Sequence, residues 1–418
     1  MKRRHGVIAP GVALVLGTAV LISATVVAPS STTAATPTPP TIVEPPHSDD
    51  PAQQAADITA IVESAIEALH LKAVIVKVQV GNDVVIRDGF GESITKVTAT
   101  PEMYFRNGAV AFSYLGNLLL QFVDEGIVSL DDTIDQWMPE LPEADVVTLK
   151  MLANQTTGYP DYEQKQEFVD AFSADPFHIF RFKERLDLAF PPGFELLFEP
   201  GTNWSYAHTN FMILGKILGK IGQQPLRQLL QERVLGPLGL SHTTETVTSE
   251  IPSPVLHTYS PERNGLYEEA TFWNTQWGTP IGANETSTVD DLITTAIAVG
   301  KGKLLSKGSK HAMTGPNLLG FGHEQDNCTP ECFEQTEFYN FGLGVFRQGK
   351  WLLQDPLLSG IGATEAYLRP GKIAIAVVTT IERDGFTPEG GYNGNPSTTL
   401  FEAIGAYMSP EHAPPIRP

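Results

Sequence analysis

The sequence contains a serine and a lysine at the spacing of a nucleophile and its proton acceptor, in Ser93-Ile94-Thr95-Lys96. On a helix such residues lie on one face, so the lysine can hold the serine proton while the hydroxyl attacks an acyl carbon. Residues 88–105, however, have the turn residues and β-branched alternation of a hairpin. In a strand the two side chains would point to opposite faces. We therefore expect no catalytic role for this pair.

A second group of residues with reactive side chains lies at residues 204–210, in the segment WSYAHTN. Tyr206 and His208 have the residue types of acid–base chemistry, because histidine titrates near neutral pH. The alternative interpretation is that both side chains only pack and form hydrogen bonds in a cleft. Without a nucleophile beside them, the sequence favours that second interpretation.

The elements that must position these residues follow from the spacing of apolar side chains. A period of about 3.6 residues predicts helices over 57–70, 115–123, 211–221, 225–234 and 397–408. Alternating or β-branched patterns predict strands over 73–80, 84–87, 341–347, 365–369 and 372–380.

The order of these elements predicts an α/β (α+β) fold. The two ends of the chain, about residues 57–105 and 335–408, are expected to build one antiparallel sheet flanked by N- and C-terminal helices. About residues 107–330 then form a large inserted helical region.

Several blocks of the chain, in order, resemble the beta-lactamase-related serine hydrolases, which include class C beta-lactamases, D-alanyl-D-alanine carboxypeptidases and esterases. They include MYFRNGAVAFSYLGNLLLQFVDEGIVSLDDTIDQWMPELP (103–142), LKMLANQTTGYPDY (149–162), STVDDLITTAIAVGKGKLLS (287–306), FGLGVF (341–346) and GATEAYLRPGKIAIAVVTT (362–380). A further block runs from EPGTNWSYAHTN to GLSHT (199–243). The likeness covers about residues 57–408 and implies the beta-lactamase/transpeptidase-like fold, but fold alone does not imply activity.

The resemblance implies where the family's nucleophilic serine and its lysine would stand. Counted from the FRNG segment, these positions hold Ala109 and Phe112, which supply neither a nucleophile nor an ammonium group. Ser113 is the reserve candidate because it lies one turn beyond Ala109. Gly116 stands at its lysine position, so nothing local would activate it.

Two other family motifs are also changed. In the Tyr-x-Asn motif, Tyr206 is retained and His208 replaces the asparagine. The His-x-Gly or Lys-x-Gly strand is replaced by a window in which the key position is Asp355, or Pro356 by the alternative count. An acidic side chain would repel the substrate carboxylate that the family usually binds there.

The N-terminus predicts export. Lys2, Arg3 and Arg4 precede a long uncharged stretch over 7–28, so residues 1–34 are a signal peptide or an uncleaved N-terminal anchor. Residues 35–52 form a Pro-rich linker, 53–412 the beta-lactamase-related domain and 413–418 a tail. Contact with a membrane is expected only through an uncleaved N-terminal segment. In an oxidising compartment Cys328 and Cys332 are expected to pair as a local disulfide.

Composition excludes further classes of function. With 28 Lys and Arg against 48 Asp and Glu, the net charge of -20 argues against a nucleic-acid partner. Two cysteines, and histidines without a ligand spacing, lead us to expect no metal and no cofactor. We predict an exported, catalytically inactive pseudoenzyme that binds a ligand or protein partner of the cell envelope. The alternative is an active hydrolase of an ester, beta-lactam or D-Ala peptide with a rearranged centre of Ser113, Tyr206 and His208.

Overall fold

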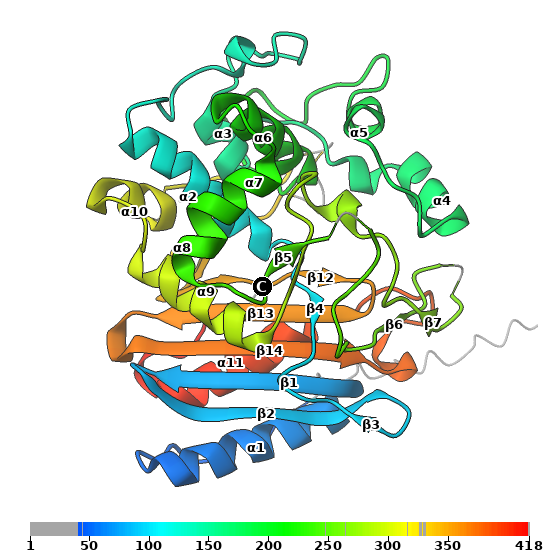
Figure 1. Cartoon of the computed structure of the whole chain (residues 1–418), viewed down its shortest axis with the longest axis vertical. Coiled ribbons are helices and arrows are strands. Elements are labelled where there is room, and N and C mark those ends of the chain that lie inside the picture. The colour runs from blue at the N-terminus through cyan, green and yellow to red at the C-terminus, as the bar shows by residue number, and fades with distance from the viewer. Residues whose placement is uncertain are drawn as a thin grey trace, which may run out of the picture. The chain divides into compact units, whose positions relative to one another are not determined.

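A nine-stranded antiparallel sheet lies at the centre of the computed structural model (Figure 1). The structure describes residues 41–416 apart from 44, 247, 264, 316, 326–327 and 329–331. Residues 40–418 form one compact unit. The predicted signal peptide or anchor lies outside the described residues. Within the described part of the chain, no helix has the length and apolar character needed to cross a membrane.

Both ends of the chain contribute strands to this sheet, as predicted. The strand order is β3-β2-β1-β14-β13-β11-β10-β9, with β12 paired to β13. N-terminal β1 pairs with C-terminal β14, and Val76 lies opposite Val377. The strands are β1 (Leu71–Val80), β2 (Asp83–Ile94), β3 (Val97–Thr98), β9 (Tyr339–Phe341), β10 (Phe346–Gln348), β11 (Trp351–Gln354), β12 (Leu357–Leu358), β13 (Ile361–Leu368) and β14 (Ile373–Ile381).

Helices cover both faces of the sheet (Figure 1). The terminal helices α1 (Pro51–Ala68) and α11 (Pro396–Met408) pack on each other and on one face, and α9 (Val289–Lys301) packs on the other. Because β13 and β14 are covered on both sides, every residue of these two strands is buried. Their sequences accordingly contain long apolar stretches rather than a strict alternation of apolar and polar residues.

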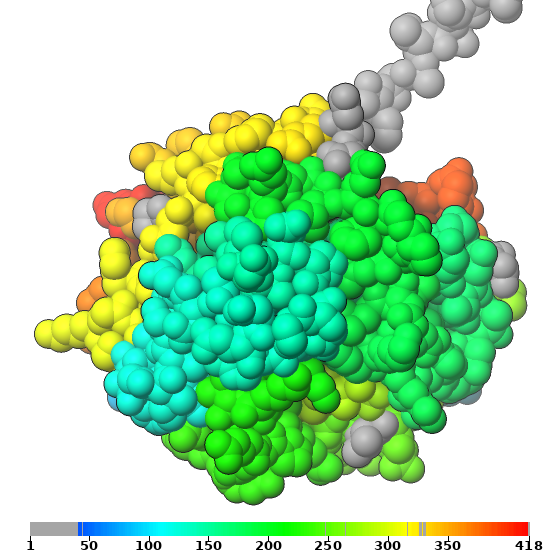
Figure 2. Space-filling model, turned by 90° about the horizontal axis from the view of Figure 1, so that it is seen from above, coloured from blue at the N-terminus to red at the C-terminus, as the bar shows by residue number. Residues whose placement is uncertain are grey.

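The inserted region is mostly helical, and Figure 2 shows it from its outer side. Its central helix is α2 (Val110–Asp124), which is buried along most of its length and packs against α6, α7 and α10. The other helices are α3 (Leu149–Asn154), α4 (Gln166–Ala174), α5 (Phe182–Ala189), α6 (His208–Ile221), α7 (Leu226–Leu230), α8 (Gly236–Leu238) and α10 (Lys307–Thr314). The structure also has two small sheets. One contains β4 (Phe105–Arg106), β5 (Thr244–Glu245) and β8 (Glu285–Ser287). The other pairs β6 (Tyr259–Ser260) with β7 (Glu268–Glu269).

The single strand predicted over 341–347 is wrong. The segment contributes to two strands, β9 and β10, which are joined by a turn. Gly344 in this turn has a φ of +79°, and a Cβ on it would lie 2.2 Å from the carbonyl oxygen of Phe112. The close approach of α2 therefore forces a turn that local strand propensity does not reveal.

The hairpin prediction for the literal serine–lysine pair is confirmed. Ser93 is buried near the end of β2, and its hydroxyl donates a hydrogen bond to the carbonyl of Val255 at 3.0 Å. Lys96 is exposed in the turn between β2 and β3, with a φ of 66°. The two side chains therefore do not form a catalytic pair.

The predicted disulfide between Cys328 and Cys332 is present. Together with Phe198, the two cysteines form a small buried cluster separate from the main core. The disulfide thus lies beside Phe198, in the segment that precedes α6.

Candidate functional site

A cavity of about 720 Å³ lies where the start of α2 faces the loop after β11. Its wall brings together five of the residues singled out in the sequence, namely Ala109, Tyr206, His208, Asp355 and Pro356. Further wall residues are Asp161, Glu163, Gln164, Glu262, Thr275, Trp277, Thr279, Phe333, Tyr339, Phe346, Leu357 and Leu358. Phe112 and Ser113 are not among the wall residues. A cleft therefore persists beside the position of the missing nucleophile.

The start of α2 places a methyl group in the cavity wall. Ala109 is the N-cap residue of this helix and makes no side-chain capping hydrogen bond. The preceding Gly108 has a φ of +50°, and a Cβ there would lie 2.8 Å from the Cβ of Pro356. The helix start is thus packed against the loop after β11, which fixes Ala109 in the wall.

Phe112 belongs to the hydrophobic core. The residue is fully buried, and its ring stacks on Phe211 of α6 with centroids 3.9 Å apart and planes 3° from parallel. The ring also lies 6.2 Å from that of Tyr206 and 6.0 Å from that of His208. The ring therefore supports the cavity wall from behind and does not fill the cavity.

Ser113 points into its own helix. It is fully buried, and its hydroxyl donates a hydrogen bond to the carbonyl oxygen of Val110 at 2.8 Å. The structure thus does not bring Ser113 into the cavity with Tyr206 and His208.

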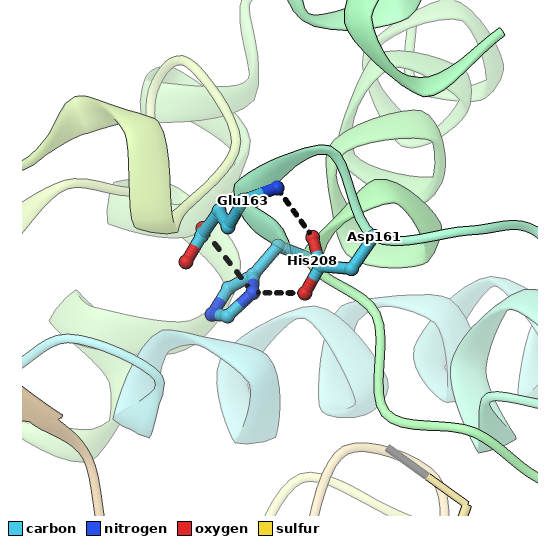
Figure 3. Close-up of side chains that lie close together, drawn as sticks. All are labelled: Asp161, Glu163 and His208. Carbon is cyan, nitrogen blue, oxygen red and sulfur yellow. Dashed lines mark hydrogen bonds and ion pairs between the residues drawn. The ribbon is translucent and has the colours of Figure 1, made fainter. Parts of the chain in front are cut away.

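His208 forms an ion-paired cluster with two carboxylates (Figure 3). Its Nδ1 lies 2.8 Å from Oδ2 of Asp161 and 3.2 Å from Oε1 of Glu163. Asp161 caps the short 3-10 turn Tyr162–Gln164, and His208 is the first residue of α6. A positive charge at a helix N-terminus is unfavourable because it faces the positive end of the helix dipole. The negative charges of the two carboxylates offset this repulsion at His208.

The cluster holds a positive charge on the imidazole. Burial alone would lower the pKa of His208, but the charges of Glu163 and Asp161 outweigh burial and raise it to about 9. Burial also raises the pKa of Glu163 well above its ordinary value, and His208 partly offsets this effect. The Nε2 atom of His208 makes no hydrogen bond to any described residue, so it can donate one to a ligand.

The same three side chains have the spacing of a metal site. One ligand atom from each of Asp161, Glu163 and His208 lies within 4.8 Å of the others. A histidine must be unprotonated to bind a metal, whereas this imidazole is held as a cation between two carboxylates. The geometry is thus better satisfied by an ion pair, and we derive no metal chemistry from it.

Asp355 and Glu262 add two more partly buried carboxyl groups to the wall. Burial raises the pKa of Asp355 to about 7, although its Oδ2 accepts a hydrogen bond from Thr398 at 3.0 Å. The charge of Glu402 on α11 raises it further. Burial likewise raises the pKa of Glu262, whose Oε2 accepts from Ser260 at 2.8 Å.

A family model described as beta-lactamase matches residues 58–393. The chain belongs to the beta-lactamase family. This confirms the predicted resemblance.

Two curated relatives match part of this beta-lactamase family chain. Penicillin-binding protein 4* of Bacillus subtilis (strain 168) is 27% identical over 169 residues, which cover 39% of this chain and 36% of the relative. Protein flp of Staphylococcus aureus (strain MW2) is 24% identical over 196 residues, which cover 45% of this chain and 37% of the relative. The chain thus matches little more than a third of each relative's length.

Solved structures share the fold over most of the chain. A D-stereospecific amidohydrolase from Streptomyces sp. aligns with a TM-score of 0.66 and 21% identity, over 80% of this chain and 97% of the other. A D-amino acid amidase from Ochrobactrum anthropi SV3 aligns with a TM-score of 0.67 and 20% identity, and the alignment covers 84% of this chain and 98% of the other. The octameric penicillin-binding protein homologue from Pyrococcus abyssi aligns with a TM-score of 0.68 and 18% identity, and the alignment covers 86% of this chain and 79% of the other. At these identities the likeness shows the fold alone.

Sequence reasoning missed Asp161, Glu163 and Glu262 as wall residues of this beta-lactamase family cleft. Asp161 and Glu163 lie in a short loop without apolar periodicity, far along the chain from His208. The available signal was the DYE triplet directly after the Gly158-Tyr159-Pro160 segment, where a turn exposes polar side chains.

Proposed function

We propose that this protein is a non-hydrolytic member of the beta-lactamase family that binds a ligand in the retained cleft. The observation behind this proposal is the methyl group of Ala109 in the cavity wall, with the Phe112 ring buried behind it. Acyl transfer through a covalent intermediate needs an activated nucleophile. Among the described residues of the wall there is no serine, cysteine or lysine.

Two further contacts argue against a rearranged catalytic centre. The Ser113 hydroxyl is engaged with Val110 inside α2. The Thr275 hydroxyl donates a hydrogen bond to Oδ1 of Asn284 at 3.0 Å. Both hydroxyl groups therefore have structural partners, which supports binding over hydrolysis.

The size of the cavity supports a small-molecule ligand. A volume of about 720 Å³ falls within the usual range for small-molecule sites. One structural neighbour is named a D-amino acid amidase and another a D-stereospecific amidohydrolase, which makes ligands of amino-acid or short-peptide size a reasonable class to test. We place this function in the cell envelope, which the basic and apolar N-terminal sequence and the disulfide support.

The proposal is tested by incubating the purified protein with a fluorescent penicillin and with short-chain p-nitrophenyl esters. We expect no covalent adduct, and no ester turnover above that of the Tyr206→Ala and Ser113→Ala variants. The first variant controls for acid–base chemistry in the cleft, and the second for the reserve nucleophile. A stoichiometric acyl adduct on the unaltered protein would overturn the proposal.

A further inference from the structure

We propose that a basic hollow at one end of the central sheet binds a compact anion of the phosphate class, with two or more negative charges. The hollow has a volume of about 730 Å³, and four basic side chains line it, Lys301, Lys310, Arg369 and Lys372. It shares no wall residue with the cleft that contains Ala109. The inference therefore goes beyond the proposed function and does not depend on it.

The basic hollow lies at the opposite end of β13 from the cleft. The turn between β1 and β2 and the turn between β13 and β14 lie side by side there (Figure 1). The N–H of Gly81 in the first turn donates a hydrogen bond to the carbonyl of Lys372 in the second, at 2.9 Å. At the other end of β13, Leu358 of the cleft wall pairs with Ile361. The eight residues of β13 span roughly 26 Å, so the two sites are separate.

Two helices bring further basic side chains to these turns. Lys301 is the last residue of α9, which packs on β13 and β14. A Cβ on Gly300 would lie 2.0 Å from the ring of Tyr367, a buried residue that also lines the hollow. A Cβ on Gly302 would lie 2.5 Å from Cδ of Lys310, so the stem of this α10 lysine lies against the end of α9. The hollow is thus assembled from four segments that only the tertiary fold brings together.

The four basic side chains of the hollow form no ion pair with any described residue. The lysine and arginine ion pairs in the described part of the chain all belong to other side chains. Asp83 is the one acidic residue in the described wall of the hollow, and it is exposed. Burial and the nearby charge of Arg369 lower the pKa of Lys310. An anion bound between these two groups would offset their mutual repulsion.

The charge and the accessibility of the hollow suit a phosphate group. The whole chain has 28 basic against 48 acidic residues, so four basic groups against one acidic group reverse its charge balance locally. Lys301, Arg369 and Lys372 are exposed, which lets a ligand reach them. Ammonium and guanidinium groups bind phosphate oxygens through charge-assisted hydrogen bonds. The phosphate group can belong to a soluble compound or to a lipid headgroup, since both present the same oxygens.

Isothermal titration calorimetry of the full-length protein with sodium pyrophosphate tests the inference. We expect binding at an ionic strength of about 0.05 M, and about fivefold weaker binding at about 0.3 M, because salt screens exposed charges. Acetate, which has one charge, should bind at least about tenfold more weakly than pyrophosphate. No binding of pyrophosphate, or equal binding of acetate, would overturn the inference.

A double variant assigns the binding to the hollow. Lys310→Gln combined with Arg369→Gln, the hollow variant, should weaken pyrophosphate binding by about tenfold. The matched control combines Lys96→Gln with Lys150→Gln, which removes the same charge at two exposed lysines outside the hollow. Its affinity should change by less than about twofold, because distant exposed charges are screened. Equal weakening in both double variants would overturn the assignment, and thermal melts confirm that each variant is folded.

Vesicles distinguish the two sources of the phosphate group. The unaltered protein and the hollow variant are sedimented with phosphatidylglycerol vesicles, and with phosphatidylcholine vesicles as the reference without net charge. About fivefold stronger binding of the unaltered protein to the anionic vesicles would support a lipid headgroup. Equal binding of the two proteins, together with binding of pyrophosphate to the hollow, would support a soluble phosphate compound. The comparison cancels any contribution of the N-terminal segment, which both proteins share.

Discussion

The two walls of the cleft differ in the kind of side chains that form them. On the α2 side, Ala109 and the Phe112 ring behind it are apolar, and the ring packs into the core against Phe211. On the opposite side, Asp161, Glu163 and His208 form a partly buried ionic cluster. Apolar packing preserves the shape of the first wall without any reactive group, whereas the second wall depends on every member of its ion pairs. A cleft can therefore keep its form while its chemistry changes.

The largest effect is expected from placing a charge in the apolar wall. Phe112→Lys removes a stacked, fully buried ring and inserts an ammonium without a partner, so the free energy of unfolding should fall by about 4 kcal/mol. Urea denaturation measures this change. Phe112→Leu, which keeps an apolar side chain, should cost about 1–2 kcal/mol. A lysine variant as stable as the leucine variant would show that this wall still accommodates the family's ammonium.

An intermediate effect is expected from the ionic wall, as a dependence of stability on pH. The pKa of His208 is raised from 6.5 to about 9 in the folded state. Its stabilising contribution is therefore fully present below pH 6.5 and is lost as the pH rises through about 9, a change of about 3 kcal/mol.

Urea denaturation over this pH range tests the prediction. The His208→Gln variant should lack this loss, because its side chain does not titrate. His323→Gln, at an exposed histidine, is the control and should follow the unaltered protein. Identical pH profiles for His208→Gln and the unaltered protein would mean that the cluster is not ionised as described.

The smallest effect is expected from Ser113→Ala. The variant loses one hydrogen bond within α2, so the free energy of unfolding should change by less than about 1 kcal/mol. Ester turnover should stay at background as well, because Ser113 is not part of the cavity wall. Ester turnover that the unaltered protein shows and this variant lacks would place Ser113 in the functional site and contradict the description of the α2 wall as chemically inert.

Much of the fold was predictable because its segments obey local periodicity. The pairing of N-terminal and C-terminal strands followed from the order of elements, and counting from the FRNG segment placed Ala109 beside the cavity. The interruption of 341–347 was not predictable, because it arises from the approach of α2 to Gly344. The partners of His208 were missed for a similar reason, since only the tertiary fold brings Asp161 and Glu163 to that ring.

The central claim is that this cleft binds ligands but does not acylate. Intact-protein mass spectrometry after incubation with benzylpenicillin tests it most directly. The account predicts that the protein keeps its unmodified mass, because no serine, cysteine or lysine lies in the described cavity wall. A stoichiometric increase equal to the mass of the antibiotic would contradict it, and loss of that increase in Ser113→Ala would identify the nucleophile.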